Sequence, residues 1–241
     1  MKAQDPNVAK VELIASALGH LREQLVFVGG CAAGLLLTDS AAASARVTFD
    51  VDLIAEVTAL SSYYKLENEF AQLGFKRDLS PDAPICRWRF GSLEVDLMPT
   101  DSHVLGFANR WYPLVAGTAQ ICTLPSSTRI RLIAAPAFVA TKFEAFADRG
   151  GGDVFGSHDL EDIINIVDGR PELAGEVAEA RDDLRAYVAG QCAALLQKPA
   201  FMDALPGLIF PDESHAERVE LLKERLRQLA LTGEAGSLKE T

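Results

Sequence analysis

Two aspartates separated by one residue, Asp50 and Asp52, lie in a stretch whose alternating apolar and polar residues predict a β-strand. Successive strand side chains point to opposite faces, so the two carboxylates share one face, and Phe49, Val51 and Leu53 share the other. Carboxylates held this close repel each other unless a cation lies between them. A donor set made only of oxygen suits Mg²⁺ or Mn²⁺ rather than zinc. An ordinary amphipathic strand with its acids in water would show the same pattern.

A third acid, Asp96, lies on another segment of the same kind. Two alternating runs between residues 85 and 98 flank Gly91-Ser92, which predicts a hairpin with a two-residue turn. Asp96 lies on the polar face of the second run, and that strand can pair beside the strand of Asp50. Taken alone, Asp96 reads as a solvated strand residue. Taken with the pair, it completes a cluster of three carboxylates.

Three carboxylates have a chemical use together. They can hold two divalent cations about 4 Å apart, and one of them can polarise an attacking hydroxyl during in-line phosphoryl or nucleotidyl transfer. The cations then neutralise a triphosphate and the departing pyrophosphate. An acidic protein can perform this chemistry because the metals supply the positive charge.

A glycine pair, Gly29 and Gly30, follows a short apolar strand at residues 25–28 and precedes a helix of small residues. Glycine lets a phosphate approach the backbone amides at the start of a helix. Close packing of the helix would favour the same residues. Arg46 and Thr48 precede the acidic pair, and the Thr48 hydroxyl is expected on the face of that pair, although threonine is also common in strands.

The composition indicates a globular protein and no extended positive surface. The 241 residues are 49% hydrophobic and 24% charged, and the net charge is −11, so no overall basic field attracts nucleic acid. The four cysteines are far apart in the sequence and predict neither a zinc site nor a disulfide framework. The sequence has neither a signal-peptide pattern nor a membrane-length apolar run, so a soluble cytoplasmic protein is expected.

The second half of the chain predicts helices. One begins at Pro136 and carries Lys142, whose charged end could reach a cleft past an apolar stripe or could simply lie in solvent. A glycine run at residues 150–152 follows, and the next predicted helix carries Asp159. Helical spacing continues in residues 171–198 and 216–229, ahead of a tail, residues 233–241, that is expected to be flexible.

These motifs in this order resemble the nucleotidyltransferase toxins of the abortive-infection AbiEii type, which belong to the DNA polymerase β-like nucleotidyltransferase superfamily. The resemblance covers residues 26–168. The motifs that carry it are Gly29-Gly30, Arg46-x-Thr48-x-Asp50-x-Asp52, Asp96, Lys142-x-x-Ala145-x-x-x-Arg149 and Asp159-Leu160-x-Asp162-Ile163. The chain departs from the family at His158, where a basic residue is usual, and in the glycine-rich segment before it.

The resemblance implies a role for each matching residue. Asp50, Asp52 and Asp96 would bind Mg²⁺ or Mn²⁺, with Asp96 also acting as the base. Lys142 would contact the triphosphate, and Asp159 would position Lys142 or the acceptor. The nucleotide itself would be bound by Gly29, Gly30, Arg46, Thr48 and Lys142.

We therefore expect an α/β nucleotidyltransferase fold in which helices flank a mixed β-sheet. Residues 1–134 would be the catalytic core, and residues 135–232 a C-terminal helical region that completes the active site. The expected reaction moves a nucleoside monophosphate from a nucleoside triphosphate to an acceptor hydroxyl on an RNA or tRNA 3′ end, or on a protein. The protein would act as the toxin of a toxin–antitoxin or phage-defence pair, with a cognate antitoxin.

Two other functions fit the same residues. The charge of −11 favours a nucleotidyltransferase that modifies a cationic antibiotic, because such molecules are attracted to acidic clefts. A non-catalytic homologue that binds a nucleotide without turnover is the other alternative. Fold alone does not decide among them.

Overall fold

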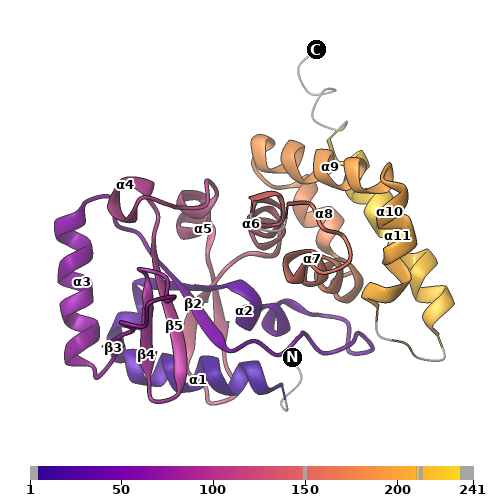
Figure 1. The fold of residues 1–241 in the computed structure, drawn as a ribbon. Helices are drawn as coiled ribbons and strands as arrows, with labels where there is room; N and C mark the ends of the chain where they lie inside the picture. Colours follow the sequence, from indigo (N-terminus) through magenta and orange to yellow (C-terminus); the bar gives the residue numbers. More distant parts are fainter. Residues whose placement is uncertain (1–4, 149–150, 210, 212–213, 234–241) are drawn as a thin grey trace. The chain divides into compact units, whose positions relative to one another are not determined.

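The computed structural model of the protein describes residues 5–148, 151–209, 211 and 214–233 (Figure 1). The chain forms two compact units. Of the described residues, 5–35 and 46–134 form the sheet unit, and 36–45 and those from 135 to 233 form the helical unit. The functional division expected at residue 134 stays a prediction. Arg149 and residues 234–241 of the expected tail lie outside the described residues.

A seven-stranded mixed sheet is the centre of the sheet unit, with the strand order β3-β4-β5-β2-β1-β7-β6. The strands are β1 Leu25–Val28, β2 Asp50–Ala55, β3 Lys76–Arg77, β4 Arg87–Phe90, β5 Leu93–Pro99, β6 Gln120–Thr123 and β7 Arg129–Leu132. β2 pairs antiparallel with β1 and parallel with β5, while β4 and β5 form the predicted hairpin. The expected mixed sheet flanked by helices is confirmed.

Helices accompany this sheet, and α1 and α3 lie beside it in Figure 1. The helices of the sheet unit are α1 Pro6–Leu18, the 3₁₀ helix η1 Gly19–Glu23, α2 Gly29–Leu36, α3 Leu60–Gln72, α4 Ser102–Leu105 and α5 Tyr112–Thr118. α1 begins where the sequence predicts, because the Asp5 side chain accepts a hydrogen bond from the Asn7 amide and Pro6 occupies the first helical position.

The two faces of β2 and β5 differ in polarity. Val51, Leu53, Val95 and Leu97 are at most 1% exposed and form part of the core. Side chains at alternate positions point the other way, so the acidic residues of these strands share the opposite face. The alternation in the sequence thus turns one face inward and leaves a polar face for chemistry.

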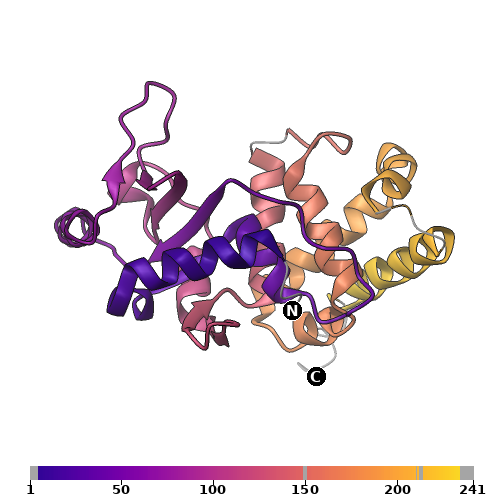
Figure 2. The same ribbon diagram turned by 90° about the horizontal axis from the view of Figure 1, so that it is seen from below.

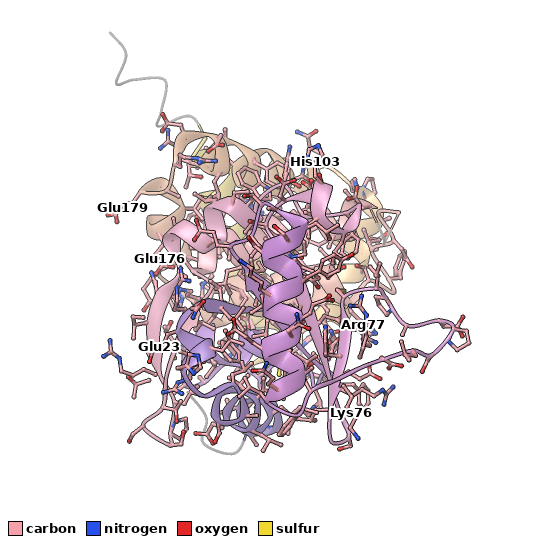
Figure 3. All side chains as sticks on the ribbon, turned by 90° about the vertical axis from the view of Figure 1, so that its left-hand side faces the viewer. Glu23, Lys76, Arg77, His103, Glu176 and Glu179 are labelled. Atoms are coloured by element: carbon pink, nitrogen blue, oxygen red, sulfur yellow. The ribbon has the colours of Figure 1, made fainter. Side chains whose placement is uncertain are left out.

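The segment between β3 and β4, residues 78–86, projects from the sheet as a long loop (Figure 2). Arg77, labelled in Figure 3, lies at the base of this loop and pairs with Glu67 of α3. β4 begins at Arg87, two residues later than the predicted hairpin strand, because the Arg87 amide donates to the Pro84 carbonyl in a turn. The loop therefore ends in a turn and delivers Arg87 directly into the strand.

The helical unit contains α6 Ala135–Asp148, α7 His158–Gly169, α8 Leu173–Ala178, α9 Asp182–Leu196, α10 Pro199–Ala204, the 3₁₀ helix η2 Leu205–Leu208 and α11 His215–Leu231. α6 packs against α7 and α9, and α11 packs against α9 and α7. The Ser157 hydroxyl caps α7 by accepting from the Leu160 amide. Among the described residues, no helix combines the length and apolar character needed to cross a membrane.

Candidate active site

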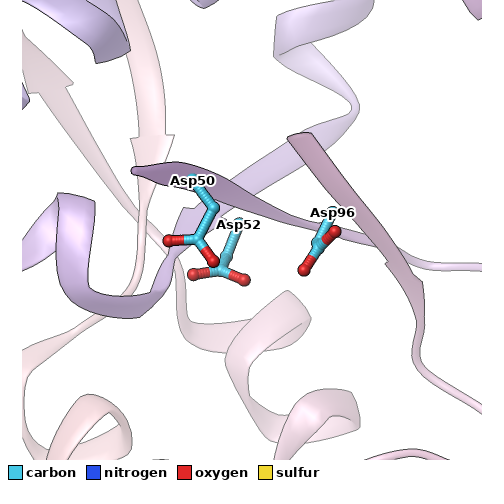
Figure 4. A group of neighbouring side chains, drawn as sticks. All are labelled: Asp50, Asp52 and Asp96. Atoms are coloured by element: carbon cyan, nitrogen blue, oxygen red, sulfur yellow. The ribbon is translucent and has the colours of Figure 1, made fainter. Parts of the chain in front are cut away.

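Asp50, Asp52 and Asp96 meet on the polar face of the sheet. β2 carries the first two, and its parallel pairing with β5 sets Asp52 directly beside Asp96. One carboxylate oxygen from each of the three residues lies within 4.8 Å of the others. Figure 4 shows the three side chains pointing into the same space from two neighbouring strands. Residues 44 positions apart in the chain thus form one cluster through strand pairing.

Gly29 lies against this cluster at the turn from β1 into α2. Its φ of +68° is in the left-handed region, and a Cβ at this position would lie 1.8 Å from Asp52 Oδ2. Only glycine tolerates both the backbone conformation and the close approach of that carboxylate. Gly30 follows as a buried residue of the first turn of α2. Phosphate binding by the two glycines stays a prediction.

Asn7 of α1 holds the segment that leads into β2. Its side-chain nitrogen donates to the Arg46 carbonyl at 2.7 Å, and its side-chain oxygen accepts from the Thr48 amide at 3.1 Å. The Thr48 hydroxyl donates to the backbone carbonyl of Asp50 at 3.2 Å. β2 begins only at Asp50. Thr48 therefore precedes the strand on which it was expected. Nucleotide binding by Arg46 and Thr48 stays a prediction.

Sequence reasoning did not identify Arg87, whose guanidinium lies among the carboxylates. Its Nε donates to Asp96 Oδ1 at 2.8 Å and its Nη2 to Asp96 Oδ2 at 2.7 Å, which makes a bidentate ion pair. Nη1 donates to Glu94 at 2.7 Å, and Nη2 lies 3.5 Å from Asp50 Oδ2. The hydrogen bonds to Asp96 raise the pKa of Arg87 above its ordinary value, despite partial burial. A fixed positive charge thus lies at the cluster.

Lys142 and Asp159 belong to the helical unit, where they contact each other. Lys142 Nζ lies 3.0 Å from Asp159 Oδ1 and 2.6 Å from Asp162 Oδ2, and all three side chains are at most 14% exposed. Burial alone would lower the pKa of Lys142, but the charges of Asp162 and Asp159 and hydrogen bonds to them raise it overall. α6 and α7 are thus joined by a buried lysine with two carboxylate partners. Asp162 is the member of this group that received no separate role from the sequence.

The donor set of the carboxylate cluster fits a hard divalent cation. It offers only oxygen atoms, which Mg²⁺ and Mn²⁺ prefer, and neither cysteine nor histidine belongs to it. Cys31 follows the glycine pair, but burial raises the pKa of its thiol to about 12, so it is protonated at neutral pH. The arrangement therefore suits charge neutralisation and phosphate chemistry rather than thiolate chemistry.

A separate open pocket of about 410 Å³ lies beyond the carboxyl ends of β2 and β5. Its lining consists of Glu56, Thr58, Thr100, Asp101, Ser102, Ala108, Asn109, Arg110 and Pro113. None of the three clustered aspartates contributes to it. The carboxylate cluster, with its oxygen atoms brought together by strand register, is the stronger candidate for the chemistry.

No protein-family model and no curated protein sequence matches this chain. Solved structures do align with it along most of its length. An antigenic nucleotidyltransferase-like protein from Paracoccidioides brasiliensis shares 20% identity over 90% of this chain and 94% of its own, with a TM-score of 0.47. JHP933 from Helicobacter pylori shares 12% identity over 99% and 97%, with a TM-score of 0.46.

The antibiotic-resistance factor ANT(2'')-Ia aligns with 15% identity over 97% of each chain and a TM-score of 0.43. Each of these alignments combines low identity with a TM-score below 0.5. The chemistry inferred below therefore follows from this protein's own side chains.

Proposed function

We propose that the protein is a Mg²⁺- or Mn²⁺-dependent nucleotidyltransferase. The observation that carries this proposal is the meeting of Asp50, Asp52 and Asp96 with their oxygens within 4.8 Å. The fit of Asp52 against Gly29, at the start of a helix, adds support, because a glycine turn before a helix suits a phosphate group. Carboxylates, a divalent cation and a phosphate-binding turn are the parts that in-line nucleotidyl transfer requires.

Each residue has a proposed role. Asp50, Asp52 and Asp96 hold the cations, which when bound supply the positive charge that neutralises the triphosphate and the departing pyrophosphate. Asp96 also takes the proton of the acceptor hydroxyl as its oxygen attacks the α-phosphorus and the bond to pyrophosphate breaks. The nucleotide is bound by the backbone amides of Gly29 and Gly30, with Arg46 and Thr48 nearby in the chain.

Lys142 is proposed to contact the triphosphate, with Asp159 positioning it. The 3.0 Å contact between Lys142 and Asp159 supports the positioning role. A lysine with two carboxylate partners is held in one place and stays charged, which suits a phosphate contact but also suits a purely structural pair. Substitution of Lys142 separates these roles. A phosphate contact predicts a higher KM for the nucleotide in the folded variant, and a purely structural pair predicts an unchanged KM.

The preferred acceptor is a hydroxyl of RNA, such as a tRNA 3′ end, or of a protein. This choice rests on the AbiEii-type motif order, which also leads us to propose action as the toxin of a toxin–antitoxin or phage-defence pair. With a net charge of −11, the chain would approach RNA through a local surface or through bound cations. The cognate antitoxin is the proposed protein partner.

A cationic small molecule, such as an aminoglycoside antibiotic, is the second candidate acceptor. The charge of −11 favours it, because an acidic protein attracts a polycationic substrate. In cells, the two candidates differ in outcome: antibiotic modification confers resistance without growth arrest, whereas RNA or protein modification by a toxin arrests growth.

The acceptor is identified by following the transferred group. Each of the four nucleoside triphosphates, labelled at the α-phosphate, is incubated with the protein, Mg²⁺ and either total RNA, total protein or an aminoglycoside panel. We expect label in the RNA or protein fraction, and its loss in the Asp50→Ala/Asp52→Ala variant. Label in the antibiotic alone would replace the toxin assignment. Nucleotide binding without label transfer to any fraction would leave the non-catalytic alternative.

A further inference from the structure

Arg87 links acids from two strands of the carboxylate cluster. β4 and β5 pair so that Arg87 lies directly opposite Asp96, and its guanidinium donates hydrogen bonds to both oxygens of that carboxylate. The same guanidinium reaches Glu94 on β5 and approaches Asp50 on β2. Its side chain is only 19% exposed. One half-buried guanidinium is therefore shared among acids that would otherwise repel one another.

An arginine that merely joined β4 to β5 would not need to approach Asp50 on β2. The backbone ladder already pairs the two strands, and Arg89 on the same strand forms ion pairs with Asp78 and Glu94 at a more exposed position. The Arg87 guanidinium also extends toward Asp50, which lies on β2, two strands away from β4. Its position matches the place where a cation is required.

We propose that Arg87 is the resident counter-cation of the metal site. It balances Asp50 and Asp96 before metal binds, orients the Asp96 carboxylate, and keeps metal affinity low until a nucleotide arrives. This inference deepens the proposed function and rests on its metal site. Arg87 is a positioning residue, because it acts through Asp96 and not on the substrate.

The physical reason is the balance of charge. A divalent cation that enters the cluster meets a fixed positive charge within hydrogen-bonding distance of the carboxylates that must bind it. Like charges in a partly buried site repel strongly. A triphosphate adds negative charge and offsets this repulsion, so metal and nucleotide bind best together. Arginine suits the role because its planar fork fixes a carboxylate in a way that lysine cannot.

The test measures Mn²⁺ binding without nucleotide, by calorimetry or by the electron spin resonance of free Mn²⁺. We expect Arg87→Ala to bind Mn²⁺ roughly tenfold more tightly than the wild type, because the competing charge is gone. Arg89→Ala, which removes a partner of Glu94 at the edge of the cluster, should leave the affinity unchanged. A variant that was simply damaged would not gain metal affinity.

Arg87→Lys separates charge from geometry. It keeps the positive charge, so Mn²⁺ affinity should stay low, but it loses the fork on Asp96, so kcat should fall while the KM for the nucleotide changes little. Arg87→Gln replaces Arg87→Ala in the binding measurement if the alanine variant does not fold.

Equal or weaker Mn²⁺ binding in the folded, uncharged Arg87 variants would overturn the counter-cation role while leaving the metal site in place. If neither wild type nor variant bound Mn²⁺, with or without nucleotide, the metal site and the role of Arg87 would fall together.

Discussion

Because Gly29 has no side chain, the Asp52 carboxylate can lie directly against the backbone of residue 29. A Cβ there would lie 1.8 Å from Asp52 Oδ2, and the φ of +68° is unfavourable for other residues. We predict that Gly29→Ala lowers the free energy of unfolding by about 2 kcal/mol. It should also weaken Mn²⁺ binding, because the Asp52 carboxylate must move. Denaturant unfolding and calorimetry measure the two effects.

Gly19→Ala is the matched control for backbone strain. Gly19 also has a positive φ, +55°, but a Cβ there would meet nothing within 4 Å. Its substitution should lower stability through backbone strain alone and leave Mn²⁺ binding intact. Unchanged Mn²⁺ binding in Gly29→Ala would contradict the account of the Gly29 turn.

Lys142 makes a prediction for the helical unit. Lys142→Met leaves Asp159 and Asp162 buried without their cation, and we expect it to lower the free energy of unfolding by about 3 kcal/mol. Lys223→Met is the control, because Lys223 pairs with an exposed Glu220, and such surface pairs contribute little. Urea unfolding compares the two. Equal losses of unfolding free energy in the two variants would contradict a special role for Lys142 and its two carboxylate partners.

The ion pairs of Lys142 also predict how the stability of the protein depends on pH. The pKa of Lys142 is raised above its ordinary value of 10.5, so the folded state holds this proton more tightly than the unfolded state. The resulting stabilisation is fully present below pH 10.5 and is lost as the pH rises through the folded-state pKa. Stability contributed by this group should therefore fall only in strongly alkaline solution, and Lys142→Met should lack this component.

At the scale of elements, α1 and β2 are joined through Asn7. This residue is fully buried and bonds both sides of the segment before β2, at Arg46 and Thr48. We predict that Asn7→Ala lowers the free energy of unfolding by about 2 kcal/mol, because it removes two side-chain hydrogen bonds to the backbone. It should also weaken Mn²⁺ binding, because the start of β2 loses its anchor. Full Mn²⁺ affinity in a folded Asn7→Ala variant would show that the anchor does not organise the site.

The elements show why only part of the site could be predicted. Alternation along β2 and the hairpin turn at Gly91 were local patterns, so they placed Asp50, Asp52 and Asp96 on polar strand faces. The predicted two-residue turn at Gly91-Ser92 already sets Arg87 opposite Asp96, so this local pattern could have identified Arg87. Its contact with Asp50 depends on the pairing of β5 with β2, which no local pattern specifies. Thr48 precedes the strand rather than lying within it, because Asn7, some forty residues earlier, binds its backbone.

At the scale of the whole molecule, the proposed metal site makes a prediction about thermal stability. A ligand that binds only the folded protein raises its melting temperature by mass action. With Arg87 in the cluster, we predict a small rise in Tm with Mg²⁺ alone, and a larger rise with Mg²⁺ and a nucleoside triphosphate together. Differential scanning fluorimetry measures both. A full rise with Mg²⁺ alone would contradict the coupling of metal and nucleotide.

Pyrophosphate release tests the central claim most directly. The wild type is supplied with Mg²⁺, each nucleoside triphosphate and total RNA or protein, and it is compared with Asp52→Asn and with Glu56→Gln, an exposed acid just past the end of β2. We predict metal-dependent release by the wild type and by Glu56→Gln, and loss of release by at least a hundredfold in Asp52→Asn, on the order expected for a group that acts in the transition state. Undiminished release from a folded Asp52→Asn variant would contradict the assignment of the three carboxylates as the catalytic centre.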